Sequence, residues 1–201
     1  MSSKTTLRLL ASAASLWVAA GAAHAQDLDG PALAALREGG HVLVMRHAQS
    51  PRQPPAADAA SPGNAGLERE LDETGRATAA AMGEAVRELE IPIGEVLSSP
   101  TFRALQTVRS AELGEPRAVP ELDAGGNDER AAWLRATAAE PPADGRNTLI
   151  VTHAPNISRA FGEAAAAMAD GEALVVRPDG GGRATVLGRI RIEEWPALAG
   201  P

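Results

Sequence analysis

The stretch that decides the fold is GHVLVMRHAQS, residues 40–50. Its centre, Val42–Met45, is a valine-rich apolar run typical of a buried strand. The run ends at two side chains that can carry positive charge, Arg46 and His47. A second run of the same kind, TLIVT at residues 148–152, is followed by His153. The sequence therefore predicts two buried strands that each deliver an imidazole at the carboxyl end.

Strand-like and helix-like segments alternate along the rest of the chain. The expected strands are 41–46, 95–98, 148–152, 173–177 and 184–192, and the expected helices are 73–90, 100–112, 128–139 and 155–169. Asp72 and Ser99 are the expected N-caps of the first two helices, and Pro100 takes a first helical position. This alternation predicts an α/β fold, a three-layer α/β/α sandwich with a mainly parallel central sheet and helices on both faces. Residues 51–66 are expected to form a long loop.

The first 25 residues have the features of a secretory signal peptide. Lys4 and Arg8 form a basic region, residues 9–20 are apolar, and Ala23–Ala25 fits a cleavage site. The apolar run is shorter than the roughly 20 residues that a membrane span needs. We expect cleavage after Ala25, one domain over residues 26–201, a periplasmic or secreted location and no stable membrane anchor after cleavage. An uncleaved N-terminal anchor is the alternative.

The composition argues against some classes of binding partner. Removing Lys4 and Arg8 leaves 19 − 2 = 17 basic residues against 26 acidic ones, so the mature net charge is −9. This charge argues against nucleic acid or an anionic membrane as a partner, and aromatic residues are only 2%, too few for base stacking. The chain contains no cysteine and so no disulfide. Because the protein as a whole is negatively charged, a site for an anion needs positive side chains gathered at one place.

Four side chains follow strands in a way that indicates such a site. In open α/β sheets, ligands bind beyond the carboxyl ends of the strands. Arg46, His47 and His153 lie there, and Arg103 falls in the first turn of a helix that begins after another strand. Helix N-termini favour anions, and a guanidinium matches the geometry of phosphate. Converging positive groups predict a phosphoryl group as ligand, and a neutral imidazole nitrogen can attack phosphorus.

Three motifs resemble the histidine phosphatase superfamily, branch 1, which contains the small phosphoglycerate mutase-like phosphatases. They are MRHA at residues 45–48, SSPTFRALQT at 98–107 and VTHA at 151–154. The stretch LERELDETGR at 67–76 also resembles that branch, and the resemblance extends over about residues 40–192. It implies that residues 26–201 form a histidine phosphatase domain.

The resemblance also implies a role for each matching residue. His47 would be the nucleophile that becomes phosphohistidine, and Arg46, Arg103 and His153 would bind the phosphoryl oxygens. Glu121, in the context VPEL at residues 119–122, would be the general acid. The competing acids are Asp123, Asp128 and Glu129. Arginines would stabilise the charge, so the implied phosphatase needs no metal and no other cofactor.

Four further residues are weaker candidates for substrate binding: Ser50, Arg52, Arg69 and Asn156. For Ser50 and Asn156 the alternative is helix capping, and for the two arginines it is ordinary exposure to solvent.

The expected activity is hydrolysis of phosphomonoesters by an exported phosphatase. RNTLIVTHAPNI at residues 146–157, with the signal peptide, is similar to exported relatives of the lipopolysaccharide core heptose phosphatases. The implied substrate is a small phosphomonoester or an envelope glycolipid phosphate. The alternatives are a phosphoglycerate mutase, a phosphohistidine protein phosphatase, a non-catalytic protein that binds a phosphorylated ligand, and a zinc site formed by His41, His47 and His153.

Overall fold

The computed structural model describes residues 30–200. The predicted signal peptide, residues 1–25, lies outside them. Within residues 30–200, no helix has the length and apolar character needed to cross a membrane.

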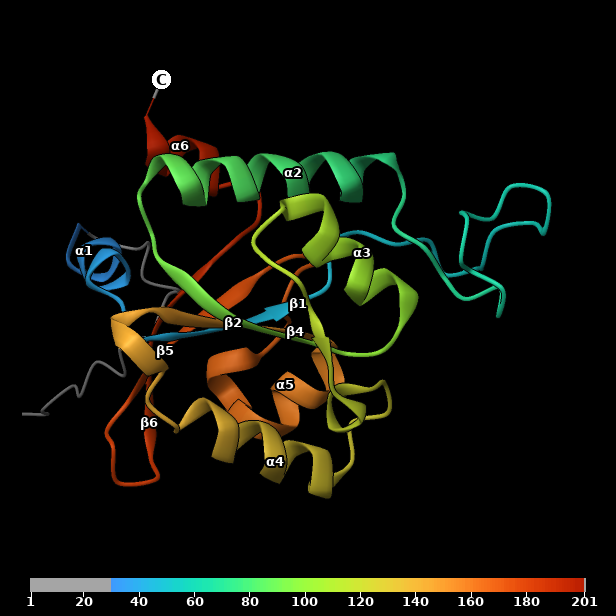
Figure 1. Ribbon diagram of the computed structural model, residues 1–201. Coiled ribbons are helices and arrows are strands. Elements are labelled where there is room, and N and C mark those ends of the chain that lie inside the picture. The colour runs from blue at the N-terminus through green and yellow to red at the C-terminus, as the bar shows by residue number, and fades with distance from the viewer. Residues whose placement is uncertain (1–29, 201) are drawn as a thin grey trace, which may run out of the picture.

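A six-stranded mixed sheet forms the centre of the molecule (Figure 1), in the order β3-β2-β4-β1-β5-β6. Its strands are β1 (Val42–Arg46), β2 (Ile93–Ser98), β3 (Arg117–Ala118), β4 (Asn147–Thr152), β5 (Ala173–Pro178) and β6 (Ala184–Ile190). The first four run parallel, whereas β5 and β6 are antiparallel additions at one edge. The neighbours β1 and β4 place Arg46 beside Thr152, so His47 and His153 leave the sheet at the same edge.

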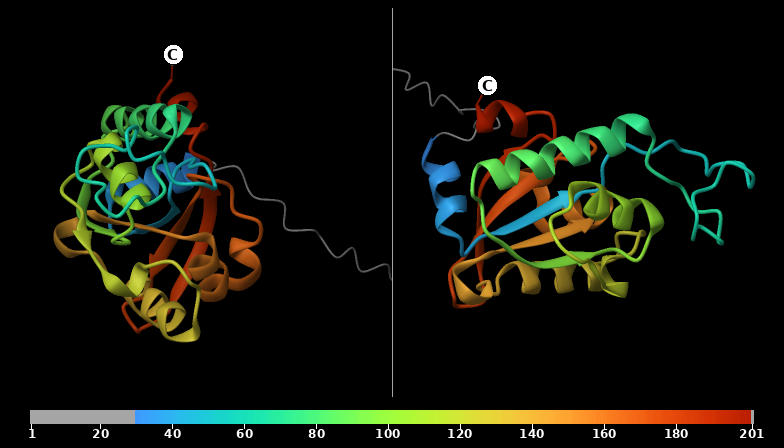
Figure 2. Two further views of the ribbon diagram at one scale, coloured as in Figure 1. Left: turned by 90° about the vertical axis from the view of Figure 1, so that its right-hand side faces the viewer. Right: turned by 45° about the horizontal axis from the view of Figure 1, so that its top comes forward.

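Helices cover both faces of the sheet (Figure 2), which confirms the predicted three-layer fold. One face carries α2 (Glu73–Glu88), α3 (Phe102–Ala111) and α6 (Trp195–Ala199), and the other carries α4 (Asp128–Ala138) and α5 (Ala154–Phe161). A further helix, α1 (Gly30–Glu38), precedes β1, and short 3-10 turns are η1 (Pro120–Leu122), η2 (Ala143–Gly145) and η3 (Gly162–Ala165). Each face has its own apolar core, because strand side chains alternate between them: Met45 packs on the α2 and α3 side and Val44 on the α4 and α5 side.

Two helix predictions differ from the structure. Helix α3 begins at Phe102, with Thr101 as N-cap, so neither Ser99 nor Pro100 has its predicted place. The helix expected over residues 155–169 ends at Phe161, because Gly162 takes a positive φ of 56° that leaves the helical region. By contrast, Asp72 caps α2 as predicted, since its side chain accepts a hydrogen bond from Gly75 N. Neither α1 nor α6 was expected.

The long loop 51–66 contains no helix or strand, as predicted. Its far end is fastened to Glu70, whose carboxylate accepts hydrogen bonds from Ser61 N (2.8 Å), Ser61 Oγ and Asn64 Nδ2 (2.7 Å). Although burial opposes it, these hydrogen bonds lower the pKa of Glu70. The loop therefore returns to the body of the molecule at a buried carboxylate directly beside Arg69.

Candidate active site

The turn after β1 is held in place by three neighbouring segments. His47 N donates to Thr152 O at the end of β4 (3.0 Å), and Ala48 N donates to Thr107 Oγ1 on α3 (3.0 Å). Gly171 N donates to His47 O (3.0 Å). The backbone that presents His47 is therefore fixed before any ligand arrives, which is the condition for a preorganised site.

The hydrogen bonds of His47 decide which ring nitrogen can react. Its Nδ1 lies 2.8 Å from Ala48 O. A carbonyl oxygen can only accept, so Nδ1 carries the proton and the lone pair of a neutral ring lies on Nε2. His47 as a residue is 4% exposed, and its reactive nitrogen faces Arg103. The geometry therefore prepares Nε2 of His47 as a nucleophile.

Arg103, in the first turn of α3, bridges the two imidazoles. Its Nε lies 3.2 Å from His47 Nε2, and its Nη2 lies 3.2 Å from His153 Nδ1. The two rings are 5.3 Å apart between centroids, at an interplanar angle of 65°. A guanidinium has no acceptor, so both contacted nitrogens present lone pairs to it. The structure thus brings together the three residues that the sequence placed after three different strands.

A serine holds the second imidazole. Ser99 Oγ lies 2.9 Å from His153 Nε2, and because Nδ1 faces a pure donor, Nε2–H donates to the serine. Thr101 N in turn donates to Ser99 Oγ at 3.2 Å. Ser99 therefore positions a ring of the site and does not cap α3. These two roles cannot be separated from the sequence alone, since both place a serine just before a helix.

Arg46 lies at the same edge but is engaged by protein groups. Its Nη1 donates to Met168 O (2.7 Å), and its Nη2 lies 2.6 Å from Asp170 Oδ1. Asp170 follows a 3-10 turn far away in the sequence, and no motif marked it. Arg46 therefore lies at the site in an ion pair with Asp170.

The environment keeps both imidazoles neutral at physiological pH. Burial is the largest cause, because the charged form loses its hydration, and three nearby arginines act in the same direction: Arg103, Arg46 and Arg69. Together they lower the pKa of His47 to about 4 and that of His153 to about 3, although the hydrogen bond to Ala48 O favours the charged form of His47. A neutral His47 is the form that can attack phosphorus.

These pKa values predict a loss of stability in mild acid. In the unfolded state an imidazole has a pKa of about 6.5. Below that pH, the two imidazoles are therefore protonated in the unfolded state but not in the folded state. The free energy of unfolding should therefore decrease from pH 7 to pH 5, until the folded rings titrate near 4 and 3. Urea denaturation of the wild type and of the double variant His47→Gln/His153→Gln measures this. The variant should lose much less stability over that interval, and equal losses in both proteins would contradict the assignment.

Asn156 has a different role from the predicted contact with substrate. Its side chain is fully buried, and Nδ2 donates to Leu122 O (3.1 Å), Asp123 O (2.8 Å) and Thr152 Oγ1 (2.9 Å). Its Oδ1 accepts from Gly126 N (2.9 Å). Both polar atoms are used inside the fold, so Asn156 anchors the segment after η1 against the start of α5.

The other three weak candidates lie along the turn that follows His47. Ser50 Oγ makes only a long contact, 3.4 Å, with Pro51 O, and Arg52 is exposed on the loop. Arg69 donates from Nη2 to Ser50 O (2.9 Å) and from Nε to Pro51 O (2.5 Å). Of the three, only Arg69 also acts on the pKa values of the imidazoles.

Two of the candidate general acids, Glu121 and Asp123, lie in and directly after η1. Glu121 lies in η1 with an exposed side chain, and none of the hydrogen bonds among residues 30–200 joins it to the imidazoles. The pKa of Arg103 is lowered by burial and by Arg69, and is raised by the opposite charges of Glu68 and Asp123. Asp123, a competitor in the sequence analysis, also lies 3.7 Å from Arg130 Nη2 through its Oδ2 atom. The identity of the general acid stays a prediction.

Three other residues lie outside the cluster. Asp128 Oδ1 pairs with Arg159 Nε at 2.7 Å, and Glu129 is exposed beside it in the first turn of α4. His41 precedes β1, so the whole strand separates it from His47. In the part of the chain that the structure describes, no group of three His, Cys, Asp or Glu side chains is arranged to hold a metal ion, and the three histidines do not form one site.

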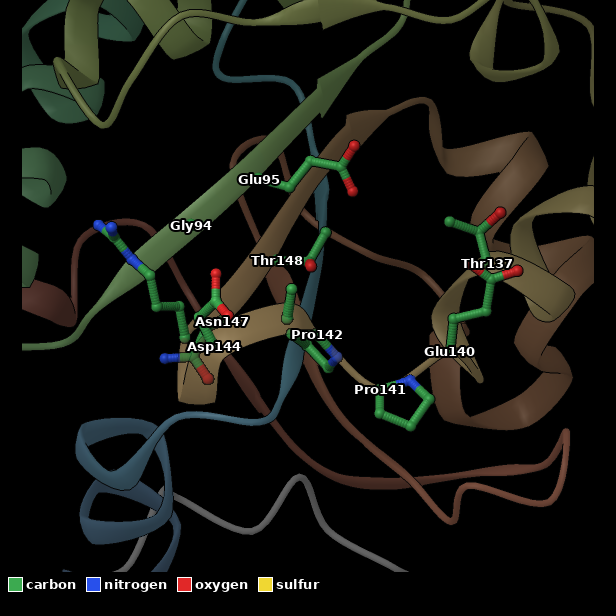
Figure 3. A pocket seen from close by; sticks show the side chains of 11 residues that line it. Gly94, Glu95, Thr137, Glu140, Pro141, Pro142, Asp144, Asn147 and Thr148 are labelled. Carbon is green, nitrogen blue, oxygen red and sulfur yellow. The ribbon is translucent and has the colours of Figure 1, made fainter.

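A hollow of about 580 Å³ lies at the opposite ends of the strands. Figure 3 shows Gly94 and Glu95 of β2 on one side of it and Glu140 with Pro141 on the other. None of the predicted site residues lines this hollow. We therefore place the candidate active site at the carboxyl edge alone.

The comparisons with known proteins agree with this geometry. Residues 42–125 match the family model described as histidine phosphatase superfamily (branch 1). The matched segment carries Arg46, His47 and Arg103 and ends before His153. No curated protein matches the chain.

Several solved structures share the fold. The protein histidine phosphatase SixA, complexed with tungstate, has a TM-score of 0.57 at 23% identity, over 77% of this chain and 98% of that one. An open reading frame product of Mycobacterium tuberculosis has a TM-score of 0.51 at 22% identity, over 74% and 96%. A phosphoserine phosphatase mutant of Entamoeba histolytica has a TM-score of 0.51 at 10% identity, over 76% and 98%.

At these identities the likeness establishes the fold. The chain shares the fold of these structures, and its residues 42–125 match the family model of the histidine phosphatase superfamily (branch 1).

Proposed function

We propose that this protein hydrolyses phosphomonoesters through a phosphohistidine intermediate on His47. One observation carries the proposal: Arg103 bridges two neutral imidazoles, and the lone pair of His47 Nε2 faces it. A phosphoryl group that enters between these groups receives donors from the guanidinium while Nε2 attacks the phosphorus.

The reaction then has two displacements. In the first, the Nε2–P bond forms as the P–O bond to the leaving group breaks, and the leaving oxygen takes a proton from a carboxylic acid. In the second, that carboxylate accepts a proton from water, the water oxygen bonds to phosphorus and the N–P bond breaks. Dividing one difficult displacement into two is the advantage of covalent catalysis, and guanidinium groups stabilise the charge of the transferring group.

The substrate and the location are part of the proposal. We propose an exported protein, with residues 1–25 as its cleaved signal peptide, that acts on an envelope or scavenged phosphomonoester without a metal ion. The proposal follows from the signal-peptide pattern of residues 1–25 and from the resemblance read in the sequence of residues 146–157. The direct test is a panel of phosphomonoesters, including phosphorylated heptose and inositol compounds, assayed with and without EDTA. Release of phosphate from at least one compound, unchanged by EDTA, is expected; hydrolysis that EDTA abolishes would contradict the metal-free mechanism.

The general acid can be identified by paired substitutions. Asn156, near the start of α5, holds the backbone of Asp123 through its carbonyl oxygen (2.8 Å), so we expect Asp123→Asn to lower kcat on phosphomonoesters by about 10²–10⁴-fold, the usual contribution of acid catalysis. Glu121→Gln, which changes an exposed side chain, should cost much less. Initial rates with an alkyl phosphate, whose leaving group needs the proton, provide the measurement. If only Glu121→Gln causes a large loss of activity, Glu121 is the general acid, as the resemblance implies.

A second candidate function is the removal of phosphate from phosphohistidine in proteins. The exposed position of Glu121 favours it, because histidine is a good leaving group that needs no strong acid. The fold is shared with a protein histidine phosphatase. If both acid substitutions leave the hydrolysis of a phosphohistidine peptide intact and lower phosphomonoester turnover, this second function is favoured.

A further inference from the structure

We propose that Glu172 and Arg189 are positioning residues of the active site. Their ion pair holds the segment of residues 166–172 in place, and the backbone of His47 lies against that segment. The inference rests on the proposed function, since His47 is the nucleophile of that reaction. Within residues 30–200, neither side chain hydrogen-bonds to an imidazole, so both act through the segment.

The ion pair is buried and makes contact at two points. Arg189 Nε lies 2.7 Å from Glu172 Oε1, and Nη2 lies 2.7 Å from Oε2. The side chain of Glu172 is 5% exposed and that of Arg189 is 19% exposed. Glu172 directly precedes β5, and Arg189 lies on β6 opposite Leu174, so the two side chains are diagonal neighbours on one face of the sheet. A two-point contact of this kind fixes the relative orientation of both groups.

Both members of the pair also bind the backbone of the segment. Glu172 Oε2 accepts a hydrogen bond from Ala169 N (2.7 Å), and Arg189 Nη1 donates to Ala166 O (2.9 Å). Between these two points, Ala167 has a φ of 51°. A residue with a Cβ keeps this left-handed conformation only where its surroundings determine it. The pair therefore holds the segment in a shape that the chain rarely adopts without such contacts.

The same segment supports the end of β1. Arg46 N donates to Glu172 O (3.0 Å), and Gly171 N donates to His47 O (3.0 Å). The guanidinium of Arg46 binds the segment at two further atoms. These contacts join the segment to the backbone that presents Nε2 of His47. A displacement of the segment would therefore displace the nucleophile.

Stability alone does not account for a charged pair at this place. Replacing a buried ion pair by apolar side chains of similar volume is often neutral for stability, whereas removing one partner is strongly destabilising. Apolar side chains, however, could not accept the hydrogen bond of Ala169 N or donate one to Ala166 O. The polar groups of Glu172 and Arg189 thus fix the position of the segment, and a double substitution separates this role from stability.

The test compares a single variant with the double variant Glu172→Met/Arg189→Met. Glu172→Met alone leaves a buried charge without its partner and should lower the free energy of unfolding. The double variant should regain most of that stability in urea denaturation, but its kcat should remain about 10- to 100-fold below that of the wild type, because a misplaced nucleophile reacts slowly. Its KM should stay close to the wild-type value, as expected where an interaction matters only in the transition state.

Two further variants complete the comparison. The matched control is Glu95→Met/Arg117→Met, which removes the exposed ion pair between β2 and β3 (2.7 Å) and should leave kcat unchanged. Arg189→Lys keeps the charge without the planar fork, so it should fold and recover part of the kcat that the double variant loses.

Amide hydrogen exchange followed by NMR provides a readout without substrate. The amides of Arg46 and Gly171 form the hydrogen bonds between the end of β1 and the segment. Both should exchange at least about 10-fold faster in the double variant, since the loss of a fastening contact lowers the free energy of local opening. In the control variant they should exchange at the wild-type rate.

Each outcome decides one claim. Wild-type kcat in the folded double variant would overturn the proposal, and so would unchanged exchange of the Gly171 amide. If the double variant does not fold, Arg189→Lys takes its place, and wild-type kcat and exchange in that variant would overturn the proposal. If exchange accelerates as expected but the wild type hydrolyses no phosphomonoester, the proposed function fails and the positioning of the His47 backbone by the pair stands. If the wild type is active and the variants match it in kcat and exchange, the reverse holds.

Discussion

Replacement of His47 by alanine is expected to reduce phosphomonoester hydrolysis to the detection limit. The substitution removes Nε2, the atom that would carry the phosphoryl group, and no described neighbour can replace it: the second ring, His153, is fixed by Ser99 at one nitrogen and meets Arg103 at the other. Loss of a nucleophile removes the covalent route itself, in contrast to loss of one stabilising contact. Steady-state assays with the best substrate of the panel measure the effect.

Two controls separate chemistry from folding. Thermal unfolding shows whether the variant is folded, and added imidazole should restore part of the activity, because it can occupy the space left by the ring. The matched histidine control is His41→Gln at the opposite end of β1, which should retain turnover in the folded protein. Full activity of the His47→Ala variant would refute the mechanism, and equal loss in His41→Gln would indicate that the histidines act on the fold.

The second large effect is expected from Arg103→Ala, with a decrease in kcat of about 10²–10³-fold, the usual effect of removing one preorganised donor. Among residues 30–200, Arg103 is the side chain that hydrogen-bonds to both rings, so its loss removes a phosphoryl donor and also the link that spaces the imidazoles. Removing its charge should also raise the pKa of both rings, since that charge lowers both of them. The acid limb of the pH–rate profile would then move to higher pH.

Arg103→Lys should fall between the wild type and alanine, because an ammonium group keeps the charge without the fork that reaches both rings. Arg109→Gln on the same helix is the control for surface charge. If Arg103→Ala keeps the kcat and the pH profile of the wild type, the central role of the guanidinium is excluded.

The strand ends were predictable from the sequence because the signals were local. Apolar runs ended at Arg46, His47 and His153, and parallel strands bring such ends to one edge. The convergence on Arg103 followed from the same rule. Asp72 at the N-terminus of α2 was also predictable, because capping depends on neighbouring residues.

The remaining features depend on contacts between distant segments. The pairing of Arg46 with Asp170 and the hydrogen bond from His153 to Ser99 join residues that no local pattern relates. Asn156 was a weak candidate for substrate binding or helix capping, and burial with four internal contacts assigns it to the fold. Glu121 was chosen from a short motif, and such a match cannot show whether a side chain turns toward the site or toward solvent.

The most direct test of the account is to trap the intermediate. The protein is mixed with a radiolabelled phosphomonoester, quenched in alkali, in which phosphohistidine survives, and digested for peptide mapping. The account predicts label on the peptide that contains His47 in the wild type and no label in His47→Ala. Turnover without labelled protein, or label on His153 or on a serine, would contradict it.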